Sequence, residues 1–475
     1  MKRLVALVFA AAFVLGSLAP AQAIEVKPSM TWELGMGWAD NTRFLDAKQG
    51  AHDDAFGVMQ RIRPQFKFIA SDTLEAVLEF ESYLMWGSNE ELDGGGAINA
   101  DQATFWIRRA YLDWSPAGDF QLRMGVQGLA LPSATFGSPI LDTDVAGIVA
   151  SYKFSDNLAL TAFWLRPFDR DYYGEDQQDG KNSLDDMDMF GLSLPLTYEA
   201  FSLNPWAMYA KNGNASEYWN SRYDADDQYF KGSSDMWWAG AAFELNLLDP
   251  FILKIDAMYG SSTSSKDAPE YKGWLVAGLF EYKTESMWGN PGLLGWYASG
   301  DDGDDYKDNG GNGSFGRMPV VSTDRAGFAP MSYGFAGSAG CMQDSLLSNS
   351  GVGTWGLGLQ LDGMSFVDKL SHTIRVAYIR GTNDKDMIRN NPDVDRDGSR
   401  LDLPGYYGAM GDAVYLTRKD HALEFDFLTK YEVNENLTLF LEANYIRLDL
   451  DSGVWGKMAD TTDAWKTQLL FEYSF

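Results

Sequence analysis

The chain has 475 residues, of which 38 are basic and 67 acidic, so its formal net charge at pH 7 is −29. This excess of carboxylates excludes nucleic acid, a polyanion, as a partner, and a single cysteine, Cys341, excludes an intrachain disulfide. Aromatic residues make up 14% of the chain, with 16 Trp and 23 Tyr, which is typical of the aromatic girdles of membrane β-barrels.

The N-terminus has the pattern of a secretory signal peptide. Two basic residues precede an apolar run from Leu4 to Leu18, and an Ala-x-Ala motif ends at Ala23. No later stretch approaches the roughly 18 to 20 apolar residues of a transmembrane helix. We therefore predict a cleaved signal peptide over residues 1–23 and one domain over residues 24–475.

The rest of the chain is dominated by runs in which apolar and polar side chains alternate. Each run is about 10 residues long, the length of a tilted strand that crosses a bilayer. In the last run, Trp465, Thr467, Leu469, Phe471, Tyr473 and Phe475 share one face, and Lys466, Gln468, Glu472 and Ser474 share the other. Short turns alternate with long polar loops, the longest at 299–351 and 381–419. The pattern predicts an all-β transmembrane antiparallel β-barrel with short periplasmic turns and long extracellular loops.

The alternation gives about 18 strands, with 16 as the alternative. The count depends on Met287–Ser299, because Pro291 and several glycines also fit a loop. A second irregularity lies between Thr104 and Trp114. There, the adjacent Arg108 and Arg109 have opposite parity, so one of them must form a bulge, reach to the membrane surface or face a neighbouring subunit.

Charged residues share the polar faces of neighbouring strands, which predicts a lining for a pore. Basic side chains lie on one strand and acidic side chains on the next, and such ladders would set a transverse field across a water-filled channel. The alternative is a set of salt bridges in the wall that has no effect on transport. The predicted pore-lining residues are Arg61, Arg63, Lys67, Glu75, Glu79, Glu81 and Arg123.

The C-terminus carries aromatic residues at alternate positions up to Phe475, with Leu469, Phe471 and Tyr473 before it. It resembles the C-terminal signal of outer-membrane proteins, which the barrel-assembly machinery reads. The N-terminal segment, the segment WIRRAYLDW from Trp106 to Trp114 and the terminal LLFEYSF together resemble the outer-membrane homotrimeric porins of sulfate-reducing, Desulfovibrio-type bacteria. The resemblance implies a homotrimer of water-filled barrels in contact with outer-membrane lipid and lipopolysaccharide.

Resemblance to trimeric porins also implies that the third outer loop, Leu129–Asp144, folds inward and forms the constriction. Its prolines and apolar residues fit a loop packed on a wall. Asp142 and Asp144 would then place negative charge at the narrowest point. The alternative is a loop packed on the outer surface.

Two acidic clusters lie in predicted outer loops. Asp393, Asp395 and Asp397 match the first half of an EF-hand loop, but Pro404 stands where the bidentate Glu belongs, which excludes a true EF-hand. The second cluster spans Asp301–Asp308 and has no fixed template. A solvated acidic surface is the default interpretation of both clusters, and a structural Ca²⁺ is the alternative. We expect no other cofactor.

The three histidines, His52, His372 and His421, lie far apart, and the sequence has no catalytic motif. We therefore expect no enzyme. The sequence predicts an outer-membrane porin, a water-filled channel for passive diffusion of ions and small hydrophilic solutes. The alternatives are a substrate-specific channel for a sugar or oxyanion, a secreted soluble β-protein that binds or hydrolyses carbohydrate, and a surface adhesin. Net acidity favours cations as the permeant ions, and the basic face from Arg61 to Lys67 opposes this preference.

Overall fold

We analysed a computed structural model of the chain. It describes residues 24–42, 44, 55–88, 94–98, 103–169, 186–213, 233–264, 270–302, 314–321, 327–335, 347, 351–389, 416–461 and 463–475. The predicted signal peptide, His52 and Cys341 lie outside these residues, as do Asp393, Asp395 and Asp397. No helix within the described ranges combines the length and the apolar character needed to cross a membrane.

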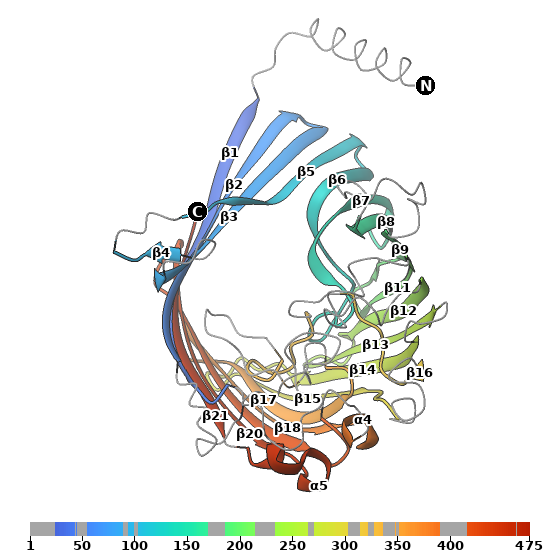
Figure 1. Cartoon of the computed structure of the whole chain (residues 1–475). Helices are drawn as coiled ribbons and strands as arrows, with labels where there is room; N and C mark the ends of the chain where they lie inside the picture. Colours follow the sequence, from blue (N-terminus) through green and yellow to red (C-terminus); the bar gives the residue numbers. More distant parts are fainter. Residues whose placement is uncertain are drawn as a thin grey trace, which may run out of the picture.

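The described strands form one antiparallel sheet that closes on itself (Figure 1). β1 pairs with β21 from Thr31↔Ser474 to Asp40↔Trp465, which joins the two ends of the sheet into a barrel. The barrel strands are β1 (Glu25–Asp40), β2 (Ala55–Ser71), β3 (Leu74–Ser88), β5 (Trp106–Ala117), β6 (Phe120–Ala130), β7 (Asp142–Ser155), β8 (Leu158–Phe168), β9 (Met187–Ser193), β10 (Leu196–Thr197), β11 (Phe201–Asn212), β12 (Ser234–Leu245), β13 (Phe251–Ser264), β14 (Glu270–Tyr282), β15 (Asn290–Ala298), β17 (Thr354–Val367), β18 (Leu370–Gly381), β19 (His421–Glu432), β20 (Leu437–Asp449) and β21 (Ala464–Ser474).

Within the described residues the barrel has 18 strands, because β9 and β10 both pair with β8 and β11 and form one interrupted strand. Two short segments, β4 (Gly94–Gly96) and β16 (Ser314–Phe315), add parallel pairings to β3 and β14. The region from Met287 to Ser299 contains β15, which pairs with β14 and β17 despite Pro291 near its start. The prediction of an all-β barrel with about 18 strands is therefore confirmed.

The connections alternate between the two ends of the barrel. Only Asp72 and Thr73 join β2 to β3, whereas residues 299–353 join β15 to β17. We call the two ends the short-turn end and the long-loop end. Among the described residues, three short helical segments lie at the long-loop end: α4 (Asp386–Arg389), α5 (Ser452–Trp455) and η2 (Gly456–Ala459).

A β-bulge in β5 explains the adjacent arginines. Arg109 pairs with Glu79 of β3, and Ile107 pairs with Phe80, so Arg108 is the extra residue. A bulge places two consecutive residues opposite one partner and lets both side chains turn to the same side. The predicted irregularity between Thr104 and Trp114 is therefore a β-bulge.

The outer face of the barrel is apolar and the inner face is mixed. Trp32 is 40% exposed, whereas the next residue, Glu33, is 8% exposed, as expected when successive side chains alternate between the two faces. Aromatic pairs such as Trp274–Tyr297 and Trp38–Phe56 lie on the outer face near the long-loop end. This distribution is that of a barrel whose outer surface contacts lipid.

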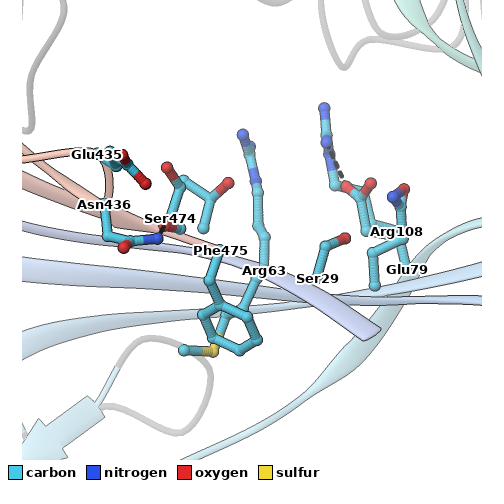
Figure 2. A pocket seen from close by; sticks show the side chains of 11 residues that line it. Ser29, Arg63, Glu79, Arg108, Glu435, Asn436, Ser474 and Phe475 are labelled. Carbon is cyan, nitrogen blue, oxygen red and sulfur yellow. Dashed lines mark hydrogen bonds and ion pairs between the residues drawn. The ribbon is translucent and has the colours of Figure 1, made fainter. Parts of the chain in front are cut away.

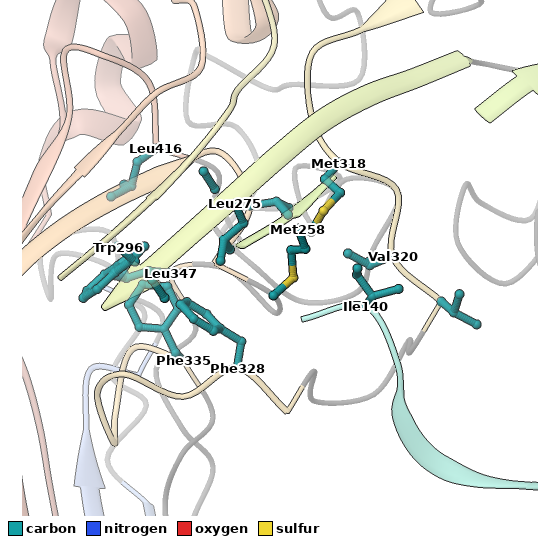
Figure 3. Close-up of a cluster of buried hydrophobic side chains, with 14 of the residues drawn as sticks. Ile140, Met258, Leu275, Trp296, Met318, Val320, Phe328, Phe335, Leu347 and Leu416 are labelled. Atoms are coloured by element: carbon teal, nitrogen blue, oxygen red, sulfur yellow. The ribbon is translucent and has the colours of Figure 1, made fainter. Parts of the chain in front are cut away.

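The interior contains a hydrophobic core on the side formed by β7 to β21, and Figure 3 shows part of it. Inward-facing apolar side chains of β11 to β15 meet side chains from two loops that enter the barrel. The first, residues 131–141, joins β6 to β7. The second comprises the described residues between 299 and 353, which lie between β15 and β17 in the chain. We call them the short and the long inward loop. The core includes Ile140, Met258, Leu275, Trp296, Met318, Val320, Phe328, Phe335, Leu347 and Leu416.

Candidate channel constriction

The short inward loop is anchored on the far wall by one carboxylate, Asp256 of β13. Ser133 Oγ donates to Asp256 Oδ2 at 2.6 Å, and the backbone nitrogen of Ala134 donates to Oδ1 at 2.7 Å. The backbone nitrogen and the hydroxyl of Thr135 donate to Oδ2 at 2.9 and 2.5 Å. Asp256 is 1% exposed, and its charge is balanced by four donors of the loop. These contacts place the third outer loop on the inner wall, and its role as the constriction stays a prediction.

The two inward loops pack against each other within the barrel. The backbone nitrogen of Val321 donates to Ile140 O at 2.7 Å, and that of Ala329 donates to Phe136 O at 2.8 Å. The rings of Phe136 and Phe328 meet edge to face at 6.1 Å between centroids. These contacts hold the two loops together inside the barrel.

A glycine makes the closest approach between the loops. Gly137 has a φ of 92°, and a Cβ at this position would lie 1.8 Å from the carbonyl oxygen of Gly327. No other residue fits both the backbone conformation and the space.

The long inward loop is held by two carboxylates of β19. The backbone nitrogens of Tyr333 and Gly334 donate to Glu424 Oε1 at 2.8 and 3.0 Å, and that of Ser332 donates to Asp426 Oδ2 at 2.7 Å. Both carboxylates are completely buried. Because backbone amides supply the donors, the anchoring requires acidic residues at these positions but no particular side chains in the loop.

The predicted pore-lining residues lie together on the opposite side of the interior, where they form salt bridges between neighbouring strands. Arg61 Nε of β2 donates to Glu33 Oε2 of β1 at 2.5 Å, and Arg63 forms a salt bridge with Glu81 of β3. Two further pairs are Lys67–Glu75 at 2.6 Å and Arg123–Asp113 at 2.8 Å. We call this surface the charged wall; it comprises Glu33, Arg61, Arg63, Lys67, Glu75, Glu79, Glu81, Arg108, Arg109, Asp113, Arg123 and Asp144.

The charges of the two ladders are arranged as salt bridges within the wall. Their effect on transport stays a prediction. Each basic side chain of the charged wall has a carboxylate within ion-pair distance. Opposite charges at such distances cancel most of each other's field beyond a few ångströms. The two ladders therefore interlock instead of facing each other across the channel.

Asp144 of β7, three residues after the short inward loop, belongs to the charged wall and connects it to this loop. Arg108 Nε and Arg109 Nε reach the two oxygens of Asp144 at 2.9 and 2.7 Å, and Arg108 Nη1 also reaches Glu79 at 2.5 Å. Pairing between β5 and β6 ends at Ala110↔Val126, whereas pairing between β6 and β7 continues to Ala130↔Asp142. Figure 1 shows β6 and β7 bending away from β5 at this point. The bulge arginines thus fasten the hairpin that carries the short inward loop.

The second predicted constriction residue, Asp142, lies against the long inward loop. It begins β7, and a Cβ built on Gly327 would lie 2.3 Å from its Oδ2, so Asp142 contacts the long inward loop. The structure therefore places both aspartates at the inward hairpin. Their influence on permeant ions stays a prediction.

A cavity of about 450 Å³ opens along the charged wall at the short-turn end. Figure 2 shows Arg63, Glu79 and Arg108 on one side, with the turn residues Glu435 and Asn436 nearby. The remaining lining residues are Ser29, Met30, Thr31, Gln65, Ser474 and Phe475. This open space thus lies beside the charged wall.

The predicted assembly signal forms the last strand of the barrel. The backbone nitrogen of Phe475 donates to Met30 O at 3.2 Å, and that of Met30 donates to Phe475 O at 3.0 Å, so the terminal residue completes the contact with β1. Tyr473 and Phe475 are exposed on the outer face, and Leu469 and Phe471 share their parity. Recognition of this strand by the assembly machinery stays a prediction.

One part of the acidic-cluster prediction is wrong. Asp301 does not lie on a solvated surface but is completely buried, with Arg317 Nε 2.7 Å from its Oδ2. Burial raises the pKa of this carboxyl, and the positive charge of Arg317 opposes the rise. Within the described part of the chain, no group of three or more His, Cys, Asp or Glu side chains could hold a metal ion.

Sequence reasoning missed the anchoring roles of Asp256, Glu424 and Asp426. Their positions on polar strand faces were predictable, but the partner loops were not. A usable signal was present in the methionines of β11 to β13. Met208, Met236 and Met258 place apolar side chains on the inner face as well, which is the pattern of strands covered on both sides.

No protein-family model matches the chain, and no curated protein sequence matches it. Several solved structures of outer-membrane porins have the same architecture. OccK8 (OprE) of Pseudomonas aeruginosa is 13% identical over 95% of this chain and 98% of its own, with a TM-score of 0.52. A BenF-like porin from Pseudomonas fluorescens Pf-5 is 11% identical, with the same coverage and a TM-score of 0.54. OpdK of Pseudomonas aeruginosa, crystallised with vanillate, is 14% identical over 94% and 98% of the two chains, with a TM-score of 0.51. At these identities the likeness shows the fold: the chain is an 18-stranded barrel of the architecture seen in these porins.

Proposed function

We propose that the protein is an outer-membrane porin whose water-filled channel runs along the charged wall. One observation carries the proposal: the apolar side of the interior is filled by the inward loops, whereas the charged side chains border an open cavity. Burying so many ionised groups without water would cost several kcal/mol for each ion, even in salt bridges. Water along the charged wall removes this cost and also provides the path for solutes.

The channel passes ions and small hydrophilic solutes by passive diffusion, with a preference for cations. Every cation of the charged wall is matched by a carboxylate, and Asp142 adds negative charge at the inward hairpin. In a chain of net charge −29, the remaining field attracts cations.

Planar-bilayer recording in a salt gradient tests both statements. The proposal predicts discrete conductance steps and a reversal potential of the sign for cation selectivity. Absence of steps with correctly folded protein would refute the channel, and a reversal potential of the opposite sign would refute only the cation preference.

A substrate-specific channel is the second candidate, and the likeness to OpdK crystallised with vanillate favours it. A specific channel binds its solute, so the solute blocks the ionic current at low concentration. A general channel shows no such block. Titration of vanillate and of several sugars during single-channel recording separates the two candidates.

The remaining features of the proposal concern assembly and location. The signal peptide over residues 1–23 directs export, and the barrel-assembly machinery inserts the barrel by reading its C-terminal strand. The finer resemblance to homotrimeric porins of Desulfovibrio-type bacteria supports a homotrimer in contact with outer-membrane lipid and lipopolysaccharide. A structural Ca²⁺ at Asp393, Asp395 and Asp397 belongs to the proposal as an alternative to a solvated loop. Migration of the detergent-extracted protein before and after heating tests barrel closure and oligomeric state together.

A further inference from the structure

Basic side chains gather on the outer face of the barrel at the long-loop end of β18 to β20. Arg380 of β18 lies beside His421 of β19, and Arg447 of β20 lies beside Leu423 of β19. Arg418 and Lys419 lie directly before β19 and are exposed. We call Arg380, Arg418, Lys419, His421 and Arg447 the basic patch.

The strand pattern shows that the patch faces outward. Ile379, Ala422 and Leu448 point into the barrel and are almost completely buried. Their neighbours on the opposite parity are exposed. Three apolar or aromatic side chains, Tyr378, Leu423 and Tyr445, continue the same outer face toward the short-turn end. The patch therefore borders the lipid-facing surface on the side of the long loops.

The cations of the basic patch are poorly neutralised by the described residues. Arg380 donates through Nε and Nη2 to the carbonyl oxygen of Arg418, at 3.0 and 2.7 Å, and has no carboxylate among its described contacts. Arg418 has its closest described carboxylate, Asp384, at 3.9 Å. Arg447 and His421 share the carboxylate of Asp449, at 3.2 and 3.4 Å, and Asp463, which accepts a hydrogen bond from the Tyr445 hydroxyl, also lies near Arg447.

Other outward cations near the same end of the barrel have close acidic partners. Arg166 forms salt bridges with Asp188 at 2.7 Å and with Asp186 at 3.2 Å. Lys211 lies 3.1 Å from Asp235. Among the described residues, the four cations of the basic patch outnumber the three carboxylates beside them, Asp384, Asp449 and Asp463, so the patch can attract an anion.

We propose that the basic patch binds the phosphate groups of a glycolipid in the outer leaflet, namely lipopolysaccharide. Arginine presents planar pairs of N–H donors that match phosphate oxygens, and two carbonyl contacts already hold the Arg380 side chain in place. The lipid's acyl chains would lie against Tyr378, Leu423 and Tyr445, where aromatic side chains favour the membrane boundary. The inference rests on the outer-membrane location in the proposed function.

A free phosphate ion offers the same chemistry but uses only part of this surface. It lacks acyl chains, so it gains nothing from the exposed apolar side chains beside the patch. The geometry therefore favours the lipid, and the two sources can be separated by experiment.

The test measures binding of diphosphoryl lipid A to the detergent-solubilised full chain by native mass spectrometry. The variant Arg380→Gln/Arg418→Gln/Arg447→Gln removes three cations. A basic residue near an anionic lipid surface contributes about fivefold to binding, so we expect at least a tenfold loss of lipid A affinity. The control Arg166→Gln/Lys211→Gln removes cations that already have carboxylate partners, and we expect it to bind lipid A like the wild-type protein.

Two outcomes would overturn the inference. One is unchanged lipid A binding by the triple variant. The other is displacement of bound lipid A by millimolar inorganic phosphate, which would identify a free-anion site. Heat-modifiable migration verifies that each variant is folded. Single-channel conductance is recorded in parallel to test the proposed function separately. Loss of lipid binding with normal conductance shows that the channel function does not depend on the patch. Absence of conductance in the wild-type protein refutes the porin instead.

Discussion

Replacement of Asp256 by Ala should release the short inward loop and widen the channel. Four hydrogen bonds from Ser133, Ala134 and Thr135 converge on this buried carboxylate. A hydrogen bond to a charged group contributes about 1.5 to 3 kcal/mol, and such contributions within one network are not additive. If only the equivalent of one to two bonds is lost, the anchored state becomes less stable by about 3 kcal/mol. This shifts the ratio of anchored to released loop by roughly a hundredfold.

Single-channel recording detects the release directly. We expect a higher conductance or frequent transitions to a higher level in Asp256→Ala, and a smaller effect in Asp256→Asn, which keeps one oxygen as an acceptor. Glu244→Gln is the matched control, because Glu244 lies on the adjacent strand of the same wall, pairs with Lys254 and makes no described contact with the loop. Wild-type conductance in folded Asp256→Ala would refute the idea that this loop sets the constriction.

Three further predictions concern the other anchors and the terminal strand. Asp144→Asn removes a negative charge and should weaken the salt bridges of Arg108 and Arg109. We therefore expect a reversal potential closer to zero in a salt gradient. An unchanged reversal potential would show that this charge does not act on permeant ions. Glu424→Ala/Asp426→Ala should release the long inward loop, because three backbone amides lose their acceptors at a cost of about 1 to 3 kcal/mol each. Limited proteolysis of the intact barrel should then cut between residues 299 and 353. Equal protection in the double variant and the wild type would contradict this. Deletion of Phe475 should lower the amount of heat-modifiable barrel in the outer membrane, measured against total protein; normal amounts would remove Phe475 from the assembly signal.

The barrel was predictable from the sequence because the side chains of each strand alternate between a lipid-facing and an inward-facing environment. Runs such as Trp465 to Phe475 alternate between a lipid face and an inner face, and this period of two residues needs no knowledge of the rest of the fold. The parity conflict at Arg108 and Arg109 was also visible locally. The bulge that resolves it follows from the need to keep both cations away from lipid.

The contacts within the interior could not be predicted in the same way. Asp256 lies more than a hundred residues from Ser133, and no local pattern indicates that they meet. The charged residues of β1 to β3 illustrate the same limit. Their faces were predicted correctly, but interlocking salt bridges depend on the register between strands, which alternation alone leaves open.

The path of solutes along the charged wall is the central claim, and cysteine accessibility tests it most directly. With Cys341 replaced by Ser, a single cysteine is introduced either at Gln65, which lines the cavity, or at Leu275, which is completely buried in the core. A water-soluble thiol reagent is then added during single-channel recording. We predict a stepwise loss of conductance for Gln65→Cys and no response for Leu275→Cys. A response at Leu275 and none at Gln65 would contradict the account.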